Sequence, residues 1–439
     1  MKLRQLLIVI LFLPQLALAQ KPGVVSDTVP CKKSAGHTYA LYLPKSYTGT
    51  TPVGLILFFD PGARGRMPID LYKSLADKYS VIIACSNNSR NGAIDVSLRA
   101  GNATLADLQE RFNINRKLII TSGFSGGGRV ASDLALKNRT IAGVIACGAA
   151  FSSDKIKVQD PLPFAEVIGE LDMNYQEALQ ANEYLKTIHN PALLTFFYGG
   201  HQWPPLDAYE QAIAWHLLRI DPTNELKRQA IAKTLKNAQV KVDSGYMFEA
   251  SHILRQMLGE DPVDSMFAIV QKDKRTRIQS KDAQKISAYE LRKKQEFGYA
   301  YTRHMAYAAP DSAYHPQFWK MFRRDCDKLV GGDRYEKRAG LRLIDYGWRL
   351  CAEQYYFFVN DGTYRQAAMS ARIWSLIQPD NPYPSVQAAR AFALQKRKED
   401  MLDYLRQAVS RGLKDKQAVM KDPDFAAYAG DADFRAVFR

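Results

Sequence analysis

The sequence predicts an α/β fold for the first half of the chain, a mostly parallel sheet flanked by helices, and an all-α fold for the second half. Two observations support this prediction. Up to about residue 220, short apolar runs typical of buried strands alternate with amphipathic stretches typical of helices. Beyond residue 220 the strand pattern stops, and apolar residues recur at steps of three and four, as in helices that pack on one another.

The strand-like runs of the first half are short and apolar, and each is followed by a helical stretch or a turn. The strand-like runs are 38–43, 54–59, 80–84, 118–121, 141–146, 164–168 and 193–197. The helical stretches are 69–79, 96–112, 128–137, 174–188 and 207–219. Few residues separate the runs 141–146 and 164–168, so we expect no large lid between them.

A repeat-like pattern marks the end of the chain. Small and aromatic residues recur there with the spacing of tetratricopeptide repeats, whose period is about 34 residues. They are Ala367, Ala371, Trp374, Pro379, Ala389, Phe392, Leu405 and Ala408. Residues 223–350 predict helical pairs without a clear repeat. Because one such pair cannot bury its own apolar face, the pairs are expected to stack into a tetratricopeptide-like domain.

The first residues have the pattern of a secretory signal peptide, with a basic start, a short apolar core and a small-residue cleavage site. Lys2 and Arg4 precede an apolar run that ends before Ala17-Leu18-Ala19. We expect a signal peptide over 1–19, a catalytic α/β domain over 20–220 and a helical domain over 221–439. The protein is therefore expected to be exported, to the periplasm or the extracellular space, with no membrane span in the mature chain.

The charge of the chain is strongly basic and unevenly placed. The formal net charge is +15, and most of the excess lies after residue 220. The densest basic run, residues 272–294, alternates with acidic and polar residues at helical spacing, which indicates a solvated helix face. No basic motif interleaved with aromatic residues occurs, so nucleic acid is not an expected partner.

Five cysteines in an exported protein leave at least one unpaired. Cys85 and Cys147 end strand-like runs, where buried thiols are expected. Whether Cys326 and Cys351 pair is left open. The pattern is not that of a small domain held together by disulfides.

A strand-to-helix turn of the G-x-S-x-G type makes Ser125 the candidate nucleophile. An apolar run leads into Gly123-Phe124-Ser125-Gly126-Gly127, and a helix-compatible stretch follows. The glycines are needed because the serine must lie on a strained turn with its hydroxyl exposed, and flanking side chains would clash. The amide of Gly126 would then point at a developing oxyanion from the helix N-terminus.

Two further strand ends supply an acid and a histidine, in the chain order serine, acid, histidine. Asp172 follows the run 164–168, and His201 follows the run 193–197. His201 is the candidate general base and Asp172 the carboxylate that orients it, with Glu170 as a rival for the acid. Neither H-E-x-x-H nor C-x-x-C spacing occurs, so no metal and no other cofactor is expected.

These residues resemble the α/β-hydrolase superfamily, and within it the secreted esterases that include polyhydroxybutyrate depolymerases and feruloyl esterases. Residues 199–204, Gly-Gly-His-Gln-Trp-Pro, are similar to that group's Gly-Gly-His-x-Trp-Pro motif, and residues 169–172, Gly-Glu-Leu-Asp, to its Gly-x-x-Asp turn. The resemblance covers about residues 35–220. It implies an α/β-hydrolase fold and ester cleavage through an acyl-enzyme.

One departure from that group concerns the second oxyanion donor. The group carries a His-Gly pair after its third strand, whereas residues 59–63 here read Phe-Asp-Pro-Gly-Ala. Because Pro61 has no N–H, Gly62 or Ala63 would have to donate. Trp203 and Tyr175 lie next to the catalytic turns. Their side chains would either contact the substrate or pack against the turn, and both interpretations stay open.

The sequence thus favours an exported serine esterase acting on a small-molecule or polymeric ester, such as acyl or feruloyl esters of polysaccharide or a short polyester. A serine peptidase on the same triad is an alternative. A non-catalytic, hydrolase-like scaffold carrying a helical-repeat binding module is another. The helical domain would bind a protein partner, cover the mouth of the active site or only stabilise the chain.

Overall fold

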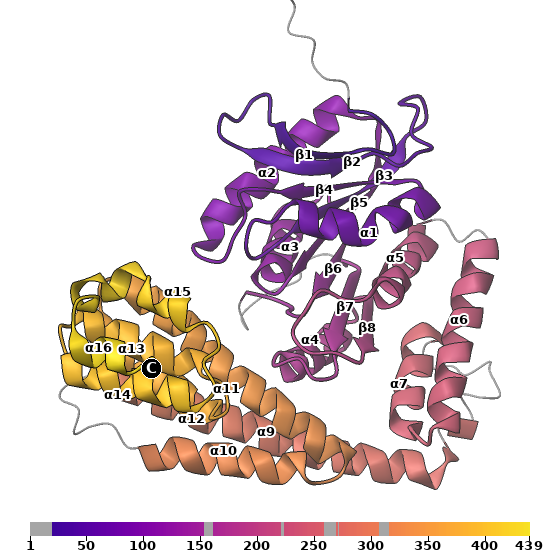
Figure 1. The fold of residues 1–439 in the computed structure, drawn as a ribbon. Helices are drawn as coiled ribbons and strands as arrows, with labels where there is room; N and C mark the ends of the chain where they lie inside the picture. Colours follow the sequence, from indigo (N-terminus) through magenta and orange to yellow (C-terminus); the bar gives the residue numbers. More distant parts are fainter. Residues whose placement is uncertain (1–19, 153–160, 221–223, 259–268, 271, 307–315) are drawn as a thin grey trace, which may run out of the picture. The chain divides into compact units, whose positions relative to one another are not determined.

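A computed structural model describes the whole chain except residues 1–19, 153–160, 221–223, 259–268, 271 and 307–315 (Figure 1). By its internal packing the chain divides into two compact units. The first contains the described residues up to Ile145 together with Ser152, and the second contains residues 146–151 and the described residues from 161 onward. The predicted signal peptide lies outside the described residues, and the predicted domain boundary at residue 220 stays a prediction.

The first unit is a sheet flanked by helices. Its strands are β1 (Val25–Pro30), β2 (Thr38–Tyr42), β3 (Val53–Phe59), β4 (Val81–Ser86), β5 (Ile114–Phe124) and the first residues of β6 (Gly143–Cys147). In hydrogen-bonding order they run β1-β2-β4-β3-β5-β6. β3 is parallel to β4 and β5, whereas β2 is antiparallel to β1 and β4. The helices are α1 (Arg66–Tyr79), α2 (Ile94–Arg111) and α3 (Gly126–Lys137).

The apolar character of the central strands follows from their surroundings. Every residue of β4, and all of β3 after Val53, is buried. Parallel strands with helices on their faces have no solvent side, so neighbouring positions must both be apolar. β1, by contrast, is an edge strand with exposed polar residues, and the sequence analysis did not predict it because its pattern resembles a loop.

A buried carboxylate ties β2 to α2. Asp107 accepts hydrogen bonds from the hydroxyl of Tyr39 at 2.7 Å, from the amide of Lys32 at 2.7 Å and from Arg111 Nε at 2.6 Å. Burial by itself raises the pKa of Asp107, but these three hydrogen bonds and the charge of Arg111 outweigh it and hold the pKa below its ordinary value.

The second unit begins with two parallel strands and their helices. β7 (Phe164–Gly169) pairs in parallel with β8 (Ala192–Phe197) from Phe164 opposite Ala192 to Gly169 opposite Phe197. Helix α4 (Tyr175–Thr187) connects them, and α5 (Leu206–Ile220) follows β8. The predicted strands and helices of the first half are therefore confirmed, as is the α/β class with a mostly parallel sheet.

Beyond residue 220, the described part of the second unit forms helices and no strands, as predicted. The helices are α6 (Asn224–Asp243), α7 (Met247–Leu258), α9 (Lys274–Ala306), α10 (Pro316–Val330), α11 (Arg334–Asn360), α12 (Tyr364–Ile377), α13 (Tyr383–Leu394), α14 (Lys398–Ser410), α15 (Lys416–Met420) and α16 (Ala432–Ala436), with a 3₁₀ turn at Pro423–Tyr428. Helix α11 starts at a capping box, in which Asp333 accepts from the amide of Glu336 and Glu336 accepts from the amide of Asp333.

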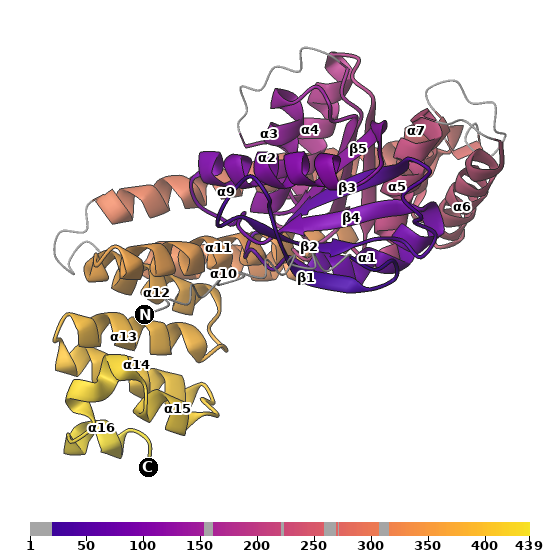
Figure 2. The same cartoon turned by 90° about the horizontal axis from the view of Figure 1, so that it is seen from above.

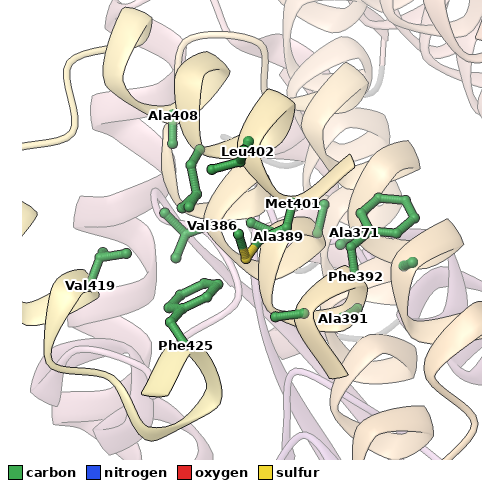
Figure 3. Packing of buried hydrophobic residues seen from close by; sticks show 14 of the residues in the cluster. Ala371, Val386, Ala389, Ala391, Phe392, Met401, Leu402, Ala408, Val419 and Phe425 are labelled. Atoms are coloured by element: carbon green, nitrogen blue, oxygen red, sulfur yellow. The ribbon is translucent and has the colours of Figure 1, made fainter. Parts of the chain in front are cut away.

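Successive C-terminal helices stack on one another, α11 on α12, α12 on α13 and α13 on α14 (Figure 2). Small residues at the contacts, such as Ala371 and Ala389, let the helices approach around the side chains of Phe392 and Met401 (Figure 3). The repeat residues predicted from the sequence between Ala367 and Ala408 are buried here, apart from Pro379. The tetratricopeptide-like character of this stack stays a prediction.

All five cysteines are buried free thiols, so the open pairing of Cys326 with Cys351 is not formed. Within the described ranges, no helix combines the length and apolar character needed to cross a bilayer.

Candidate active site

Ser125 lies on a strained turn between β5 and α3. Ser125 has a φ of 53° and a ψ of −124°. A positive φ is strained for a residue that carries a side chain. The flanking glycines have no room for side chains, because a Cβ on Gly123 would lie 2.2 Å from the Gly127 carbonyl oxygen, and one on Gly127 would lie 2.0 Å from that of Phe59. The close approach of strand, turn and helix therefore depends on the glycines of the G-x-S-x-G pattern, as predicted from the sequence.

The predicted second oxyanion donors are both engaged within their own turn. The amide of Gly62 donates to Asp60 Oδ1 at 2.8 Å, and the amide of Ala63 donates to the Asp60 carbonyl at 3.1 Å. Arg64 also binds the buried carboxylate of Asp60, at 2.8 Å and 3.0 Å. Either predicted donor could serve an oxyanion only after giving up its bond to Asp60.

A residue that sequence reasoning missed lies against the predicted first oxyanion donor. A Cβ on Gly126 would lie 1.9 Å from Asn91 Oδ1 and 3.7 Å from Asn91 Nδ2, so the amide side chain of Asn91 covers this glycine. The backbone of Asn91 donates to the Pro61 carbonyl at 2.8 Å, which holds the two loops together. No local motif marks Asn91, because only the tertiary fold brings it to the turn.

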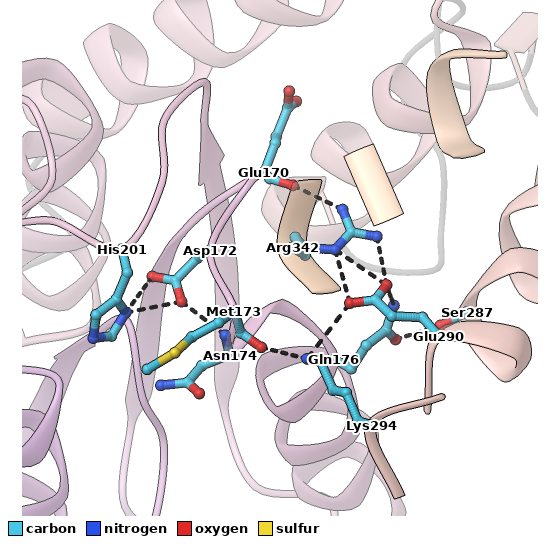
Figure 4. Close-up of polar contacts among 10 residues, drawn as sticks. All are labelled: Glu170, Asp172, Met173, Asn174, Gln176, His201, Ser287, Glu290, Lys294 and Arg342. Atoms are coloured by element: carbon cyan, nitrogen blue, oxygen red, sulfur yellow. Dashed lines mark hydrogen bonds and ion pairs between the residues drawn. The ribbon is translucent and has the colours of Figure 1, made fainter. Parts of the chain in front are cut away.

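Asp172 and His201 form a buried hydrogen-bonded pair. Both carboxylate oxygens of Asp172 lie 2.9 Å from His201 Nδ1 (Figure 4). The side chains of Asp172 and His201 are 1% and 5% exposed. An ionised carboxylate only accepts hydrogen bonds, so Nδ1 carries the proton and Nε2 is left as the basic nitrogen. Asp172 Oδ1 is further fixed by the amide of Asn174 at 2.8 Å.

The turn that carries Asp172, residues 169–174 and here called the acid turn, is joined to the histidine loop by its backbone. The amide of Glu170 donates to the Phe197 carbonyl at 2.8 Å, and that of Leu171 donates to the Gly199 carbonyl at 2.9 Å. A Cβ on Gly169 would lie 2.3 Å from the Gly199 carbonyl oxygen, so this approach requires glycine. The two loops thus reach hydrogen-bonding distance because β7 and β8 are neighbouring parallel strands.

The rival acid, Glu170, points away from His201 (Figure 4). Its carboxylate pairs with Arg338 at 2.9 Å and with Lys241 at 3.6 Å. It lines a cavity of about 150 Å³, together with Tyr175, Glu249 and Arg342. The carboxylate that contacts the imidazole of His201 is therefore that of Asp172, and not that of Glu170.

Helices α9 and α11 carry a second polar cluster that touches the acid turn. Glu290, which is fully buried, binds Arg342 Nε at 3.0 Å and Arg342 Nη2 at 2.7 Å. Burial by itself raises the pKa of Glu290. The charge and hydrogen bonds of Arg342, the charge of Lys294 and the hydrogen bond from Gln176 outweigh this effect and hold the pKa below its ordinary value. No local motif marks these four residues in the sequence, and the alternation of charges over residues 272–294 predicted a solvated face for Lys294. In the structure its side chain is only 14% exposed.

The two predicted substrate-contact residues are both packed. Trp203 is 7% exposed. The guanidinium of Arg342 lies over the ring of Tyr175, 4.3 Å from its centroid, and the ring of Phe196 lies 5.4 Å away, centroid to centroid. Shielding from water raises the pKa of Tyr175 to about 12. These contacts show packing of the turns, and a role in binding substrate stays a prediction.

Of the predicted triad, the structure brings Asp172 and His201 together. Ser125 belongs to the first unit, and its meeting with His201 stays a prediction. Among the described residues, no three His, Cys, Asp or Glu side chains gather as ligands of a metal ion would.

Solved structures similar to part of this chain are esterases and serine hydrolases. An S-formylglutathione hydrolase from Staphylococcus aureus matches with 18% identity and a TM-score of 0.37, over 44% of this chain and 98% of that one. A ferulic acid esterase matches with 16% identity and a TM-score of 0.37, over 46% and 98%. A thermophilic esterase from Thermogutta terrifontis matches with 14% identity and a TM-score of 0.36, over 44% and 93%. No family model and no curated protein matches the sequence.

Proposed function

We propose that this chain is an exported serine hydrolase that cleaves carboxylic esters, with Ser125 as nucleophile, His201 as general base and Asp172 as the carboxylate that orients His201. The observation that carries the proposal is the buried Asp172–His201 pair, in which both carboxylate oxygens lie 2.9 Å from Nδ1. This contact fixes the tautomer that has a basic Nε2, which is what activation of a serine hydroxyl requires.

In the proposed reaction, His201 Nε2 takes the hydroxyl proton of Ser125 while Oγ attacks the ester carbonyl carbon. The Gly126 amide, at the start of α3, stabilises the oxyanion of the tetrahedral intermediate. The intermediate collapses when the bond from the carbonyl carbon to the alkoxy oxygen breaks, and the imidazolium gives its proton to the departing alcohol. Water then attacks the acyl-enzyme by the same steps, which releases the acid and restores Ser125.

The positive φ of Ser125 supports the nucleophile assignment independently of the pair. A serine held at φ 53° is under backbone strain, and such strain persists where the surrounding fold enforces it, as at active sites. The N-terminal pattern supports export. The resemblance of residues 199–204 to the motif of the secreted esterase group implies acyl or feruloyl esters of polysaccharide, or short polyesters, as substrates.

The test is hydrolysis of a panel of p-nitrophenyl esters of varied acyl length, feruloyl esters, acetyl-xylan and aminoacyl amides. We expect ester turnover and fluorophosphonate labelling, both lost in Ser125→Ala and His201→Ala. Ester turnover that survives Ser125→Ala would overturn the catalytic assignment. Amide turnover without ester turnover would favour a peptidase, and silence on every substrate together with absent labelling would favour a non-catalytic scaffold.

A further inference from the structure

We infer that helices α9 and α11 complete the active site by holding the acid turn, and that Glu290, Arg342 and Lys294 are positioning residues for Asp172. The inference rests on the proposed function, since it deepens the account of the same site. It assigns the helical region a role that no sequence motif indicates.

Two largely shielded cations, Arg342 and Lys294, bind the backbone on both sides of Asp172. Arg342 Nη1 donates to the carbonyl of Glu170 at 2.8 Å, and Lys294 Nζ donates to the carbonyl of Met173 (Figure 4). Asp172 lies between these two anchored carbonyls in the chain. A displacement of the turn would therefore have to break at least one charge-assisted hydrogen bond inside the protein.

The cations are themselves fixed by one carboxylate. Arg342 donates hydrogen bonds from Nε and Nη2 to the carboxylate of Glu290 and from Nη1 to the Glu170 carbonyl. Its guanidinium also lies over the ring of Tyr175. Lys294 Nζ lies 3.5 Å from Glu290 Oε1. Glu290 is fully buried and Arg342 is 5% exposed, so neither charge can exchange its partner for water. The planar guanidinium therefore holds one geometry.

Helix α4, which begins directly after the acid turn, is attached to the same cluster. Gln176 Nε2 donates to Glu290 Oε2 at 2.7 Å, and its Oε1 accepts from Ser287 on α9. The turn and the first residues of α4 are thus tied to α9 and α11 by side chains, in addition to the backbone bonds that join the turn to the histidine loop.

The consequence for catalysis follows from the geometry of the pair. Asp172 orients His201 only while both carboxylate oxygens face Nδ1, and that depends on where the turn lies. Misplacement of a catalytic group by about 1 Å can cost about 100-fold in rate. Loss of the anchors should therefore lower kcat while leaving substrate binding in place.

The experiment compares Arg342→Lys with Arg349→Lys in the full-length protein. Lysine keeps the positive charge beside Glu290 but lacks the fork that reaches Glu290 and the Glu170 carbonyl together. Arg349 is a matched control on the same helix, because it pairs with Asp345 of that helix at 2.9 Å. A double variant, Glu290→Met with Arg342→Met, removes the buried ion pair without changing the net charge, but it also takes the carboxylate away from Lys294. Its circular dichroism spectrum and thermal melt are therefore compared with those of the wild type before its kinetics are measured.

We expect kcat on the best ester to fall about 100-fold in Arg342→Lys and in the double variant, with KM unchanged, and to stay at the wild-type value in Arg349→Lys. The second readout is the NMR signal of the proton on His201 Nδ1, which its bond to Asp172 shields from exchange with water. We expect this signal to weaken and exchange faster in the two variants, and not in Arg349→Lys.

Folded variants with wild-type kcat and an unchanged Nδ1 proton signal would overturn the positioning role and leave the proposed function standing. A wild-type protein without hydrolytic activity, whose Nδ1 proton is nevertheless lost in Arg342→Lys, would overturn the proposed function and leave the positioning of Asp172 standing.

Discussion

Arg342 donates a hydrogen bond of 2.8 Å to the backbone carbonyl of Glu170, which lies 172 positions earlier in the chain. The same guanidinium binds the buried carboxylate of Glu290. Through this contact the last third of the chain reaches the turn that presents Asp172 to His201. Helix α11 of the helical region is thereby in direct contact with the acid turn.

The choice between the two acids can be tested directly. Asp172→Asn should lower kcat by about 10⁴-fold, because an amide at this position no longer fixes the tautomer with a basic Nε2. Glu170→Gln is the matched control, since its carboxylate faces Arg338 instead of the imidazole. Steady-state kinetics on one ester would measure both. A large loss in Glu170→Gln with activity retained in Asp172→Asn would reverse the assignment.

A pair of glycine substitutions tests the close approach of the acid turn and the histidine loop. Gly169→Ala should lower the free energy of unfolding by about 2 kcal/mol or more, because its Cβ would lie 2.3 Å from the Gly199 carbonyl oxygen. Gly200→Ala should change it by less than about 0.5 kcal/mol, since nothing lies within 4 Å of a Cβ there. Urea unfolding measures both, and equal effects would contradict the packing described.

Asp107 predicts a pH dependence of stability. Its pKa is lowered in the folded protein, so its contribution is present above the unfolded pKa and is lost as the pH falls through the folded value. Asp107→Asn should destabilise by about 1–3 kcal/mol at neutral pH. The difference in the free energy of unfolding between wild type and Asp107→Asn should become smaller below about pH 4.

Urea unfolding at neutral and acidic pH would measure this difference. Asp70→Asn, which removes an exposed partner of Arg66 and Lys73, is the control and should change stability by less than about 1 kcal/mol at any pH. A difference between wild type and Asp107→Asn that does not vary with pH would contradict the linkage.

The thiols should be inert in the folded protein. All five cysteines are buried, and burial raises the pKa of Cys326 to about 12, so little thiolate is available to react. An aromatic disulfide reagent should therefore titrate no thiol in native protein and all five in denaturant. Only three thiols in denaturant would indicate a disulfide and contradict the structure.

Asn91 could act as the second oxyanion donor only after its side-chain amide turns, because Oδ1, an acceptor, lies nearer to Gly126 than Nδ2 does. Its amide covers Gly126, whereas the amides of Gly62 and Ala63 are bound to Asp60. Asn91→Ala should lower kcat by about 100-fold with little change in KM, as loss of one oxyanion donor does. Asn102→Ala, which removes an amide bonded to the Leu98 carbonyl on α2, should leave kcat unchanged. Unchanged kcat in Asn91→Ala would return the role to Gly62 or Ala63.

Much of the fold could be predicted because its signals are local. The strand-like runs correspond to β2–β8, since strands buried on both faces are apolar at most positions, and the helices follow from their periodicity. The turn at Ser125 was predictable because steric crowding within a few residues dictates its glycines. β1 could not be predicted, because an edge strand keeps polar residues on its exposed side.

The sequence by itself determined the order of strands and helices, the strained serine turn, and a histidine and an acid placed after neighbouring strands. Only the tertiary structure decided which acid faces His201, since Glu170 and Asp172 are two residues apart and the path of the turn sets their directions. It also decided the contacts that Glu290, Lys294 and Arg342 make with one another and with the acid turn. Contacts between residues so far apart in the chain leave no periodic or local pattern, because they depend on how separate helices pack around one buried carboxylate.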